Sequence, residues 1–145
     1  MNNTQRVNAA SAPKPLGAYS HAARAGNWLF ISGQGARDPG TGKLVSPTRT
    51  SSGQYANYDM RGHTRACIEN LRAVVESAGG TLADIVDVTV LLINMDDFAA
   101  FNEVYEQYFS ESRPARTTLA VSALPMENII EIKAIACLRD AWTSS

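Results

Sequence analysis

Two amphipathic helical segments, set among extended runs, restrict the folds that this chain can adopt. Residues 59–78 place apolar side chains at the spacing of one helical stripe and charged side chains on the other faces. Asp59 is a predicted N-cap, and Gly79 is the kind of residue with which helices commonly end. A second helix is predicted to begin at Asp96 or Asp97 and to end near Phe109. Its predicted buried side comprises Phe98, Phe101, Val104, Tyr105 and Tyr108.

Four runs of apolar and β-branched residues predict strands. They are residues 28–33, 85–93, 116–121 and 129–138. The first twelve residues are polar and small, and we expect them to be loose unless a strand captures residues 6–9. Residues 38–43, with the sequence DPGTGK, predict a turn. Residues 44–58 are rich in Ser, Thr and Gly and predict an inserted irregular loop, which is either a lid or a plain surface loop.

This order of elements predicts a single α+β domain over residues 1–145. Two helices interleaved with some six strands favour a mixed sheet with both helices packed on one face. The chain offers no third helix to cover the other face of the sheet. We therefore expect that face to be covered by association between copies of the chain.

The last predicted strand, IIEIKAIACL, supports a one-sided sheet. Every second residue from Ile130 to Leu138 is apolar and is expected to face the helices. Glu131 and Lys133 then lie on the opposite face, in the middle of the strand. Two interpretations stay open: a solvated face with an ion pair, or a cleft at a subunit boundary that holds a carboxylate and an ammonium group.

The composition excludes several classes of function. The formal charge is −1, from 13 basic and 14 acidic side chains, so a nucleic-acid binder driven by electrostatics is disfavoured. No apolar run is long enough for a membrane helix or a signal peptide, and a cytoplasmic location is expected. Cys67 and Cys137 form no CxxC pair, and His21 and His63 have no ligand spacing, so neither a metal nor another cofactor is expected.

Several ordered motifs together resemble the Rid family of reactive-intermediate deaminases, also called the YjgF, YER057c and UK114 family. The motifs are PLGAYSHA, ISGQGARDPGTGKLV, ACIENLRAVVESAGG, DIVDVTVLLINMDDFAAFNEVYEQYF, RPARTTLAV and EIKAIAC. The resemblance spans roughly Pro15 to Cys137. It implies a chorismate-mutase-like fold and a homotrimer whose sheets close a central β-barrel, with clefts between neighbouring subunits and with trimers that pair in some cases.

The resemblance implies two catalytic residues. Arg116 matches the arginine of the Pro-Ala-Arg segment, which binds a substrate carboxylate in the deaminases. The chemistry suits this role, because a planar guanidinium makes two parallel hydrogen bonds to a carboxylate. Glu131 matches the glutamate that contacts a catalytic water. Arg113 matches no site residue and is interpreted as a surface charge.

Further residues are implied as substrate-binding positions. Tyr19 matches the tyrosine of a Gly-Pro-Tyr segment, although Ala18 replaces the usual proline. Ser32 and Gly33 match a Ser-Gly pair that lines the cleft, and Asn102 matches an asparagine of the second helix. Two further positions depart from the usual pattern and are expected to shape the pocket: Thr118, where a small residue or cysteine is common, and Lys133, where an acidic residue is common.

The implied reaction is hydrolysis of an enamine or imine carboxylic acid to a keto acid and ammonia. Within the family, the motifs most resemble the 2-aminomuconate deaminases of aromatic-compound catabolism, whose product is 2-hydroxymuconate or its tautomer 4-oxalocrotonate. Lys133, Arg37 or His21 are candidates for binding the second carboxylate of that substrate. The alternatives are a general 2-iminobutanoate/2-iminopropanoate deaminase and a non-enzymatic regulatory trimer that binds small ligands. An older ribonuclease description of this family requires a basic groove, which the near-neutral charge does not favour.

Overall fold

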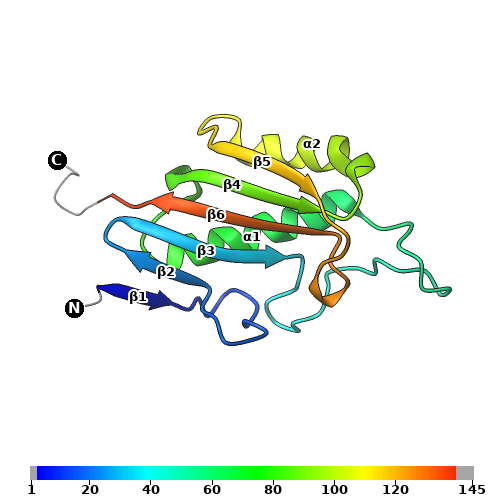
Figure 1. The fold of residues 1–145 in the computed structure, drawn as a ribbon, viewed down its shortest axis with the longest axis horizontal. Coiled ribbons are helices and arrows are strands. Elements are labelled where there is room, and N and C mark those ends of the chain that lie inside the picture. The colour runs from blue at the N-terminus through cyan, green and yellow to red at the C-terminus, as the bar shows by residue number, and fades with distance from the viewer. Residues whose placement is uncertain (1–2, 140–145) are drawn as a thin grey trace.

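The computed structural model describes residues 3–139, which form one mixed sheet with two helices behind it (Figure 1). The strands are β1 (Thr4–Val7), β2 (Ala22–Ala25), β3 (Trp28–Gly35), β4 (Ile85–Leu92), β5 (Ala115–Ala120) and β6 (Ile130–Cys137), and the helices are α1 (Met60–Ser77) and α2 (Phe98–Phe109). The sheet order is β1-β2-β3-β6-β4-β5, in which only β4 and β5 are parallel neighbours. The predicted α+β architecture, with six strands and helices on one face, is confirmed.

The core lies between the sheet and the helices. Ile130, Ile132, Ala134 and Ala136 of β6 are all buried, as the alternation in that strand predicts. On β4, Val88, Val90 and Leu92 are fully buried on the same side. From α1, residues on the predicted apolar stripe complete this layer: Cys67, Leu71, Val74 and Val75.

The ends of α1 form as the sequence predicts. The Asp59 carboxylate accepts a hydrogen bond from the backbone N–H of Gly62 at 3.0 Å, which satisfies one of the free donors of the first turn. After Ala78, Gly79 has a φ of +89°, a left-handed conformation that a residue with a Cβ rarely adopts.

The beginning of α2 differs from the prediction. Asp97 occupies the N-cap position but its side chain accepts no capping hydrogen bond. Instead, Asn94 caps a short 3₁₀ turn, Met95–Asp97, that leads into the helix. Phe98 was predicted on the buried side, yet 37% of it is exposed, because it lies in the first turn at the edge of the sheet. Phe101, Val104, Tyr105 and Phe109 form the buried side of the helix.

The N-terminal segment is more ordered than the sequence predicts. β1 forms at Thr4–Val7, two residues earlier than the strand considered at residues 6–9, and pairs with β2. β2 was not predicted, because a four-residue run of alanines around one arginine has little strand character of its own. Beyond β1, the buried His21 ring accepts a hydrogen bond from the N–H of Ala9 at 2.8 Å and contacts the carbonyl of Pro13 at 2.6 Å. These bonds fix the segment that follows the strand.

The inserted loop is irregular, as expected, and projects from one end of the sheet (Figure 1). Its base is anchored to the body of the protein. Ser46 contacts the buried ring of His63 at 2.9 Å, and the Thr48 hydroxyl donates to the carbonyl of Glu127 at 2.8 Å. Arg49 forms an ion pair with Glu127 at 3.0 Å. The predicted turn precedes the loop and is closed by a hydrogen bond from Asp38 N–H to Lys43 carbonyl.

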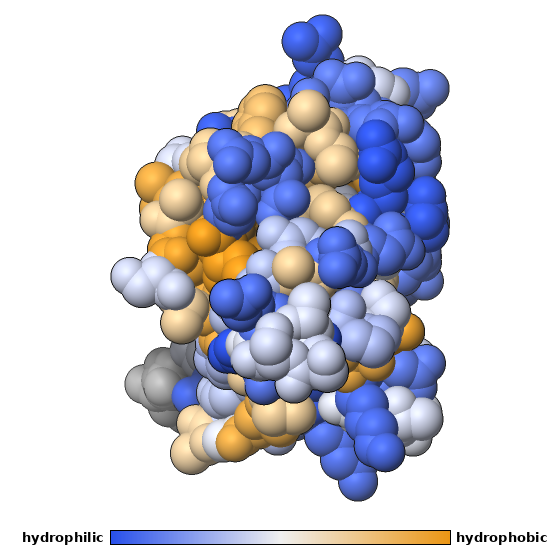
Figure 2. All heavy atoms as spheres, turned by 90° about the vertical axis from the view of Figure 1, so that its right-hand side faces the viewer, coloured by the Kyte–Doolittle hydropathy of each residue, from blue (hydrophilic) through white to orange (hydrophobic). Residues whose placement is uncertain are grey.

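Within residues 3–139, one face of the sheet has no helix and carries large apolar side chains. Strand register places Trp28 and Phe30 of β3 on this open face, together with Leu119 of β5. Phe30 is 46% exposed and Leu119 is 47% exposed. In Figure 2, which views the end from which the loop projects, hydrophobic residues gather toward the left and hydrophilic residues along the right. The open face therefore offers apolar surface that association between copies would cover.

Candidate active site

Arg116 is held against α2 by hydrogen bonds. It lies opposite Val88 in the β4–β5 register, which places its side chain on the helix-covered face at the edge of the sheet. Its Nη1 donates to the side-chain oxygen of Asn102 at 2.8 Å. Asn102 in turn donates from Nδ2 to Glu106 Oε1 at 3.1 Å. The predicted pair of Arg116 and Asn102 is thus brought together, and Glu106 orients the asparagine.

Three aromatic rings of α2 surround the Arg116 guanidinium. Its central carbon lies 4.6 Å from the ring centroid of Tyr105, 5.4 Å from that of Phe101 and 5.6 Å from that of Phe98. These are distances at which a ring attracts a cation, so the rings help to fix the plane of the guanidinium. Burial raises the pKa of Tyr105, and the charge of Arg116 acts in the opposite direction.

The guanidinium keeps most of its donors for a ligand. It has five N–H groups, and the bond to Asn102 occupies one of them. Within residues 3–139, no carboxylate forms an ion pair with Arg116. A cavity of about 370 Å³ opens beside it, lined also by Asn102, Tyr105 and Arg113. Sequence analysis treated Arg113 as a plain surface charge, because only the turn after α2 brings it to this cavity.

Glu131 lies on the opposite, open face of the sheet. It pairs with Leu91 of β4 and with Gly35 of β3. A Cβ on Gly33 would lie 2.7 Å from the carboxyl carbon of Glu131, so only glycine allows this side chain its position. Burial raises the pKa of Glu131 above its usual value. Since no hydrogen bond or ion pair within the described chain engages this carboxylate, it is available to a water or a ligand.

Tyr19, Ser32 and Lys133 line a cavity of about 360 Å³ on the same open face. The Ser32 hydroxyl donates to the carbonyl of Ser20 at 2.7 Å. The Tyr19 hydroxyl accepts the N–H of Leu16 at 3.1 Å, which leaves its own proton for another acceptor. Tyr19 also lines a smaller neighbouring cavity of about 20 Å³ that reaches Gly33. Gly33 lies against the Glu131 side chain, so this cavity adjoins the carboxylate.

The predicted residues therefore form two half-sites in one chain. Arg116 and Asn102 make the first, and the open-face group around Glu131 makes the second. β4 lies between β5 and β6, and the two catalytic candidates point to opposite faces of the sheet. Thr118 lies on the Arg116 face, half-buried opposite Val90, outside the residues that line the Arg116 cavity.

The contacts bear on the three residues considered as binding partners for a second substrate carboxylate. His21 is buried and both ring nitrogens are engaged, so it is not free to bind a substrate. Arg37 donates to the carbonyl of Lys14 at 2.7 Å, although its remaining donors are not used by that bond. In the part of the chain that the structure describes, Lys133 forms no ion pair with Glu131, so the solvated ion pair considered for this strand is absent.

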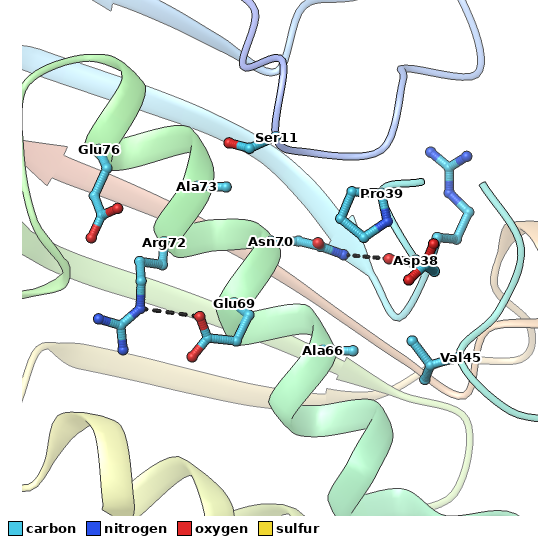
Figure 3. A pocket seen from close by; sticks show the side chains of 11 residues that line it. Ser11, Asp38, Pro39, Val45, Ala66, Glu69, Asn70, Arg72, Ala73 and Glu76 are labelled. Carbon is cyan, nitrogen blue, oxygen red and sulfur yellow. Dashed lines mark hydrogen bonds and ion pairs between the residues drawn. The ribbon is translucent and has the colours of Figure 1, made fainter. Parts of the chain in front are cut away.

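A further cavity, of about 350 Å³, lies along α1 and is lined by Arg37 but by none of the other predicted site residues (Figure 3). Several of its polar side chains make contacts within the fold. Arg72 pairs with Glu69 at 3.2 Å, and Asn70 donates to the carbonyls of Gly35 and Arg37 at 3.0 and 2.9 Å. These contacts attach the turn after β3 to the helix, which supports the strand that carries Ser32 and Gly33.

Within residues 3–139, no group of His, Cys, Asp and Glu side chains has an arrangement that would hold a metal ion. None of the helices in that range combines the length and the apolar character of a membrane span.

Solved structures with the same architecture define the class of the protein. A putative endoribonuclease of Thermotoga maritima superposes with a TM-score of 0.83 at 41% sequence identity, and the match covers 94% of this chain and 98% of that one. The chain belongs to the Endoribonuclease L-PSP family, whose model matches residues 9–138, and this is the Rid and YjgF family that its motifs resemble.

Named relatives cover most of the chain. A RutC family protein of Pyrococcus horikoshii is 48% identical over 126 residues, which are 87% of this chain and 91% of the relative. The human protein named 2-iminobutanoate/2-iminopropanoate deaminase is 34% identical over 139 residues, which are 96% of this chain and 93% of the relative.

Proposed function

We propose that the protein is a cofactor-independent deaminase that hydrolyses an enamine or imine carboxylic acid to a keto acid and ammonia. The observation that carries this proposal is the Arg116 guanidinium, oriented by Asn102 and aromatic rings, without a carboxylate partner in the described chain. An oriented and unpaired fork of donors suits a carboxylic acid ligand. The deaminase names of relatives at about one-third identity support the same chemistry.

Each half-site contributes one part of the proposed reaction. Arg116 binds the carboxylate adjacent to the C=N carbon and fixes its orientation. A water adds to that carbon, and Glu131 accepts a proton from it; the proton is then delivered to the departing nitrogen, which leaves as ammonia. One water is consumed, and the C=N bond is replaced by a C=O bond. A half-buried carboxylate with a raised pKa is suited to accept and return a proton.

The proposal requires two copies of the chain. Because Arg116 and Glu131 lie on opposite faces of one sheet, a complete site arises where the Arg116 edge of one copy meets the open face of another. We propose a homotrimer with its sheets closed into a barrel, and a pair of such trimers as a further possible assembly. The apolar side chains of the open face support this association. We also propose that the protein acts in the cytoplasm, without a nucleic-acid or membrane partner.

For the natural substrate we propose 2-aminomuconate, on the strength of the sequence motifs quoted above. The alternative is a short monocarboxylic imine such as 2-iminopropanoate, which the names of the deaminase relatives favour. The rates of ammonia release from both substrates, measured with one enzyme preparation, show which of the two the protein prefers. A strong preference for the short imine would exclude the aminomuconate assignment.

The test of the reaction class uses two variants. Arg116→Lys keeps the charge but loses the planar fork, and we expect it to lose most of its deamination on every substrate. Glu131→Gln keeps the shape of the side chain, and we expect it to bind substrate but to release ammonia slowly. If both variants deaminate at the parent rate while the assembly size is unchanged, the proposed function is wrong. A non-enzymatic binding protein would show ligand binding with no ammonia release in the unmodified chain.

A further inference from the structure

The open-face cavity beside the second half-site carries two positive charges. Besides Lys133 and Tyr19, it is lined by Arg6 of β1. No acidic residue is among the residues that line it, which otherwise are Ser20, Ala22, Ala23, Phe30, Ile31 and Ser32. A cleft lined by one sign of charge concentrates ligands of the opposite sign.

Strand register explains how two distant cations share this cavity. Arg6 pairs with Ala23, Ala23 pairs with Phe30, and Phe30 pairs with Ile135, so all four side chains lie on the open face together with Lys133. Three strand spacings separate β1 from β6, roughly 14 Å. Long side chains can approach each other over that span, because Ala23 of β2 has a short side chain. Phe30 of β3 stands in the same row and forms a wall of the cavity.

Neither cation is neutralised by a residue of the described chain. Within residues 3–139, Arg6 and Lys133 take part in no ion pair. Tyr19 adds a third donor, because its hydroxyl oxygen already accepts the Leu16 N–H and its proton remains available. The cavity therefore presents an arginine, a lysine and a phenol to whatever enters it. This set of donors matches a carboxylate or another small anion.

We propose that Arg6, Lys133 and Tyr19 form a subsite for a second acidic group of the substrate, which makes a dicarboxylic acid the preferred substrate class. The inference rests on the proposed function, in which Arg116 of a neighbouring copy binds the first carboxylate. Arg6 is the new residue in this proposal, because no sequence motif indicated that the first strand contributes to a site. The subsite is continuous with the catalytic half-site, because Tyr19 also lines the small cavity that reaches Gly33 beneath Glu131.

The subsite makes a specific claim about selectivity. A monocarboxylic imine would occupy the Arg116 end and leave the two cations without a partner. A dicarboxylic substrate would engage both ends. Loss of one charge-assisted hydrogen bond typically lowers affinity by about ten- to a hundredfold. We therefore expect Arg6→Gln or Lys133→Met to reduce the ratio of dicarboxylate to monocarboxylate kcat/KM by about tenfold or more.

The experiment measures deamination of 2-aminomuconate and of 2-iminopropanoate by the full chain and by both variants. Arg24→Gln is the matched control, because Arg24 is an arginine of the neighbouring strand β2 whose Nε donates to the carbonyl of Gly26. We expect this control to keep the selectivity of the parent. If Arg6→Gln and Lys133→Met change the two substrates equally, or change neither, the subsite is refuted. Thermal melting and assembly size confirm that each variant is folded.

A binding measurement separates failure of this inference from failure of the proposed function. Titration calorimetry with adipate and with hexanoate reports the second carboxylate without any catalysis. We expect the parent protein to bind adipate more tightly than hexanoate, more so at low ionic strength, and Arg6→Gln to remove most of that difference. If the parent releases no ammonia but shows this preference, the deaminase proposal fails and the subsite stands. If the parent binds both acids equally, the subsite is refuted whatever the activity.

Discussion

Placement of Arg116 and Glu131 on opposite faces of one sheet predicts that inactive subunits complement each other. An Arg116→Ala chain keeps a working Glu131 half-site, and a Glu131→Gln chain keeps a working Arg116 half-site. Loss of two charge-assisted hydrogen bonds should reduce deamination by Arg116→Ala roughly 10²- to 10⁴-fold, and loss of the general base should have an effect of similar size. Each variant alone is therefore expected to be nearly inactive.

Mixed assemblies of the two variants should regain a fixed fraction of activity. In the proposed assembly, each site takes its arginine from one copy and its glutamate from the next. In the proposed trimer, every assembly that contains both variants has one site with an intact arginine and an intact glutamate, so a third of its sites are complete. We expect such mixed assemblies to reach about a third of the parent rate, at least ten times the rate of either variant alone.

The assay co-expresses the two chains with different affinity tags, isolates assemblies that carry both tags and measures ammonia release. A mixture of Arg116→Ala and Asn102→Ala is the matched control, because both changes damage the same half-site. No combination of those two chains produces an intact arginine half-site, and we expect no recovery. If doubly tagged assemblies of Arg116→Ala and Glu131→Gln show only the average of the rates of the two variants, the site does not form between copies.

Three further changes test the site and the fold. Gly33→Ala would bring a methyl group to 2.7 Å from the Glu131 carboxyl carbon. Because that atom is the end of a flexible side chain, we expect the carboxylate to be displaced and deamination to slow while the melting temperature changes little; an unchanged rate would contradict the close approach. Burial raises the folded-state pKa of Glu131, so the contribution of its protonated form to stability is lost as pH rises through that pKa. Glu131→Gln should therefore be more stable than the parent at neutral pH and should lack this pH dependence. Chemical denaturation at several pH values measures the free energy of unfolding of both proteins. Asp59→Ala removes the N-cap of α1 and should lower the free energy of unfolding by about 1 kcal/mol without changing kcat. A lower kcat, measured where the variant is fully folded, would contradict a purely structural role.

Local sequence was sufficient where a residue's environment depends on its near neighbours. The alternation of β6 identified its buried face, and the N-cap at Asp59 and the left-handed Gly79 followed from the chemistry of helix ends. β2 was missed because its pairing with β1 and β3, and not its own composition, makes it a strand. Phe98 was misplaced because helical periodicity does not show where the sheet that covers a helix ends.

The site divides in the same way. The resemblance to the Rid family pointed to Arg116, Asn102 and Glu131 as candidate site residues, because motif positions can be matched along the chain without a structure. Only the tertiary structure decided that Arg116 and Glu131 point to opposite faces, because strand order and register depend on hydrogen bonds between segments far apart in the chain. The same long-range pairing brought Arg6 to the cavity of Lys133, 127 positions along the chain. Side-chain chemistry is local, whereas the direction in which a strand presents a side chain is set by its partners.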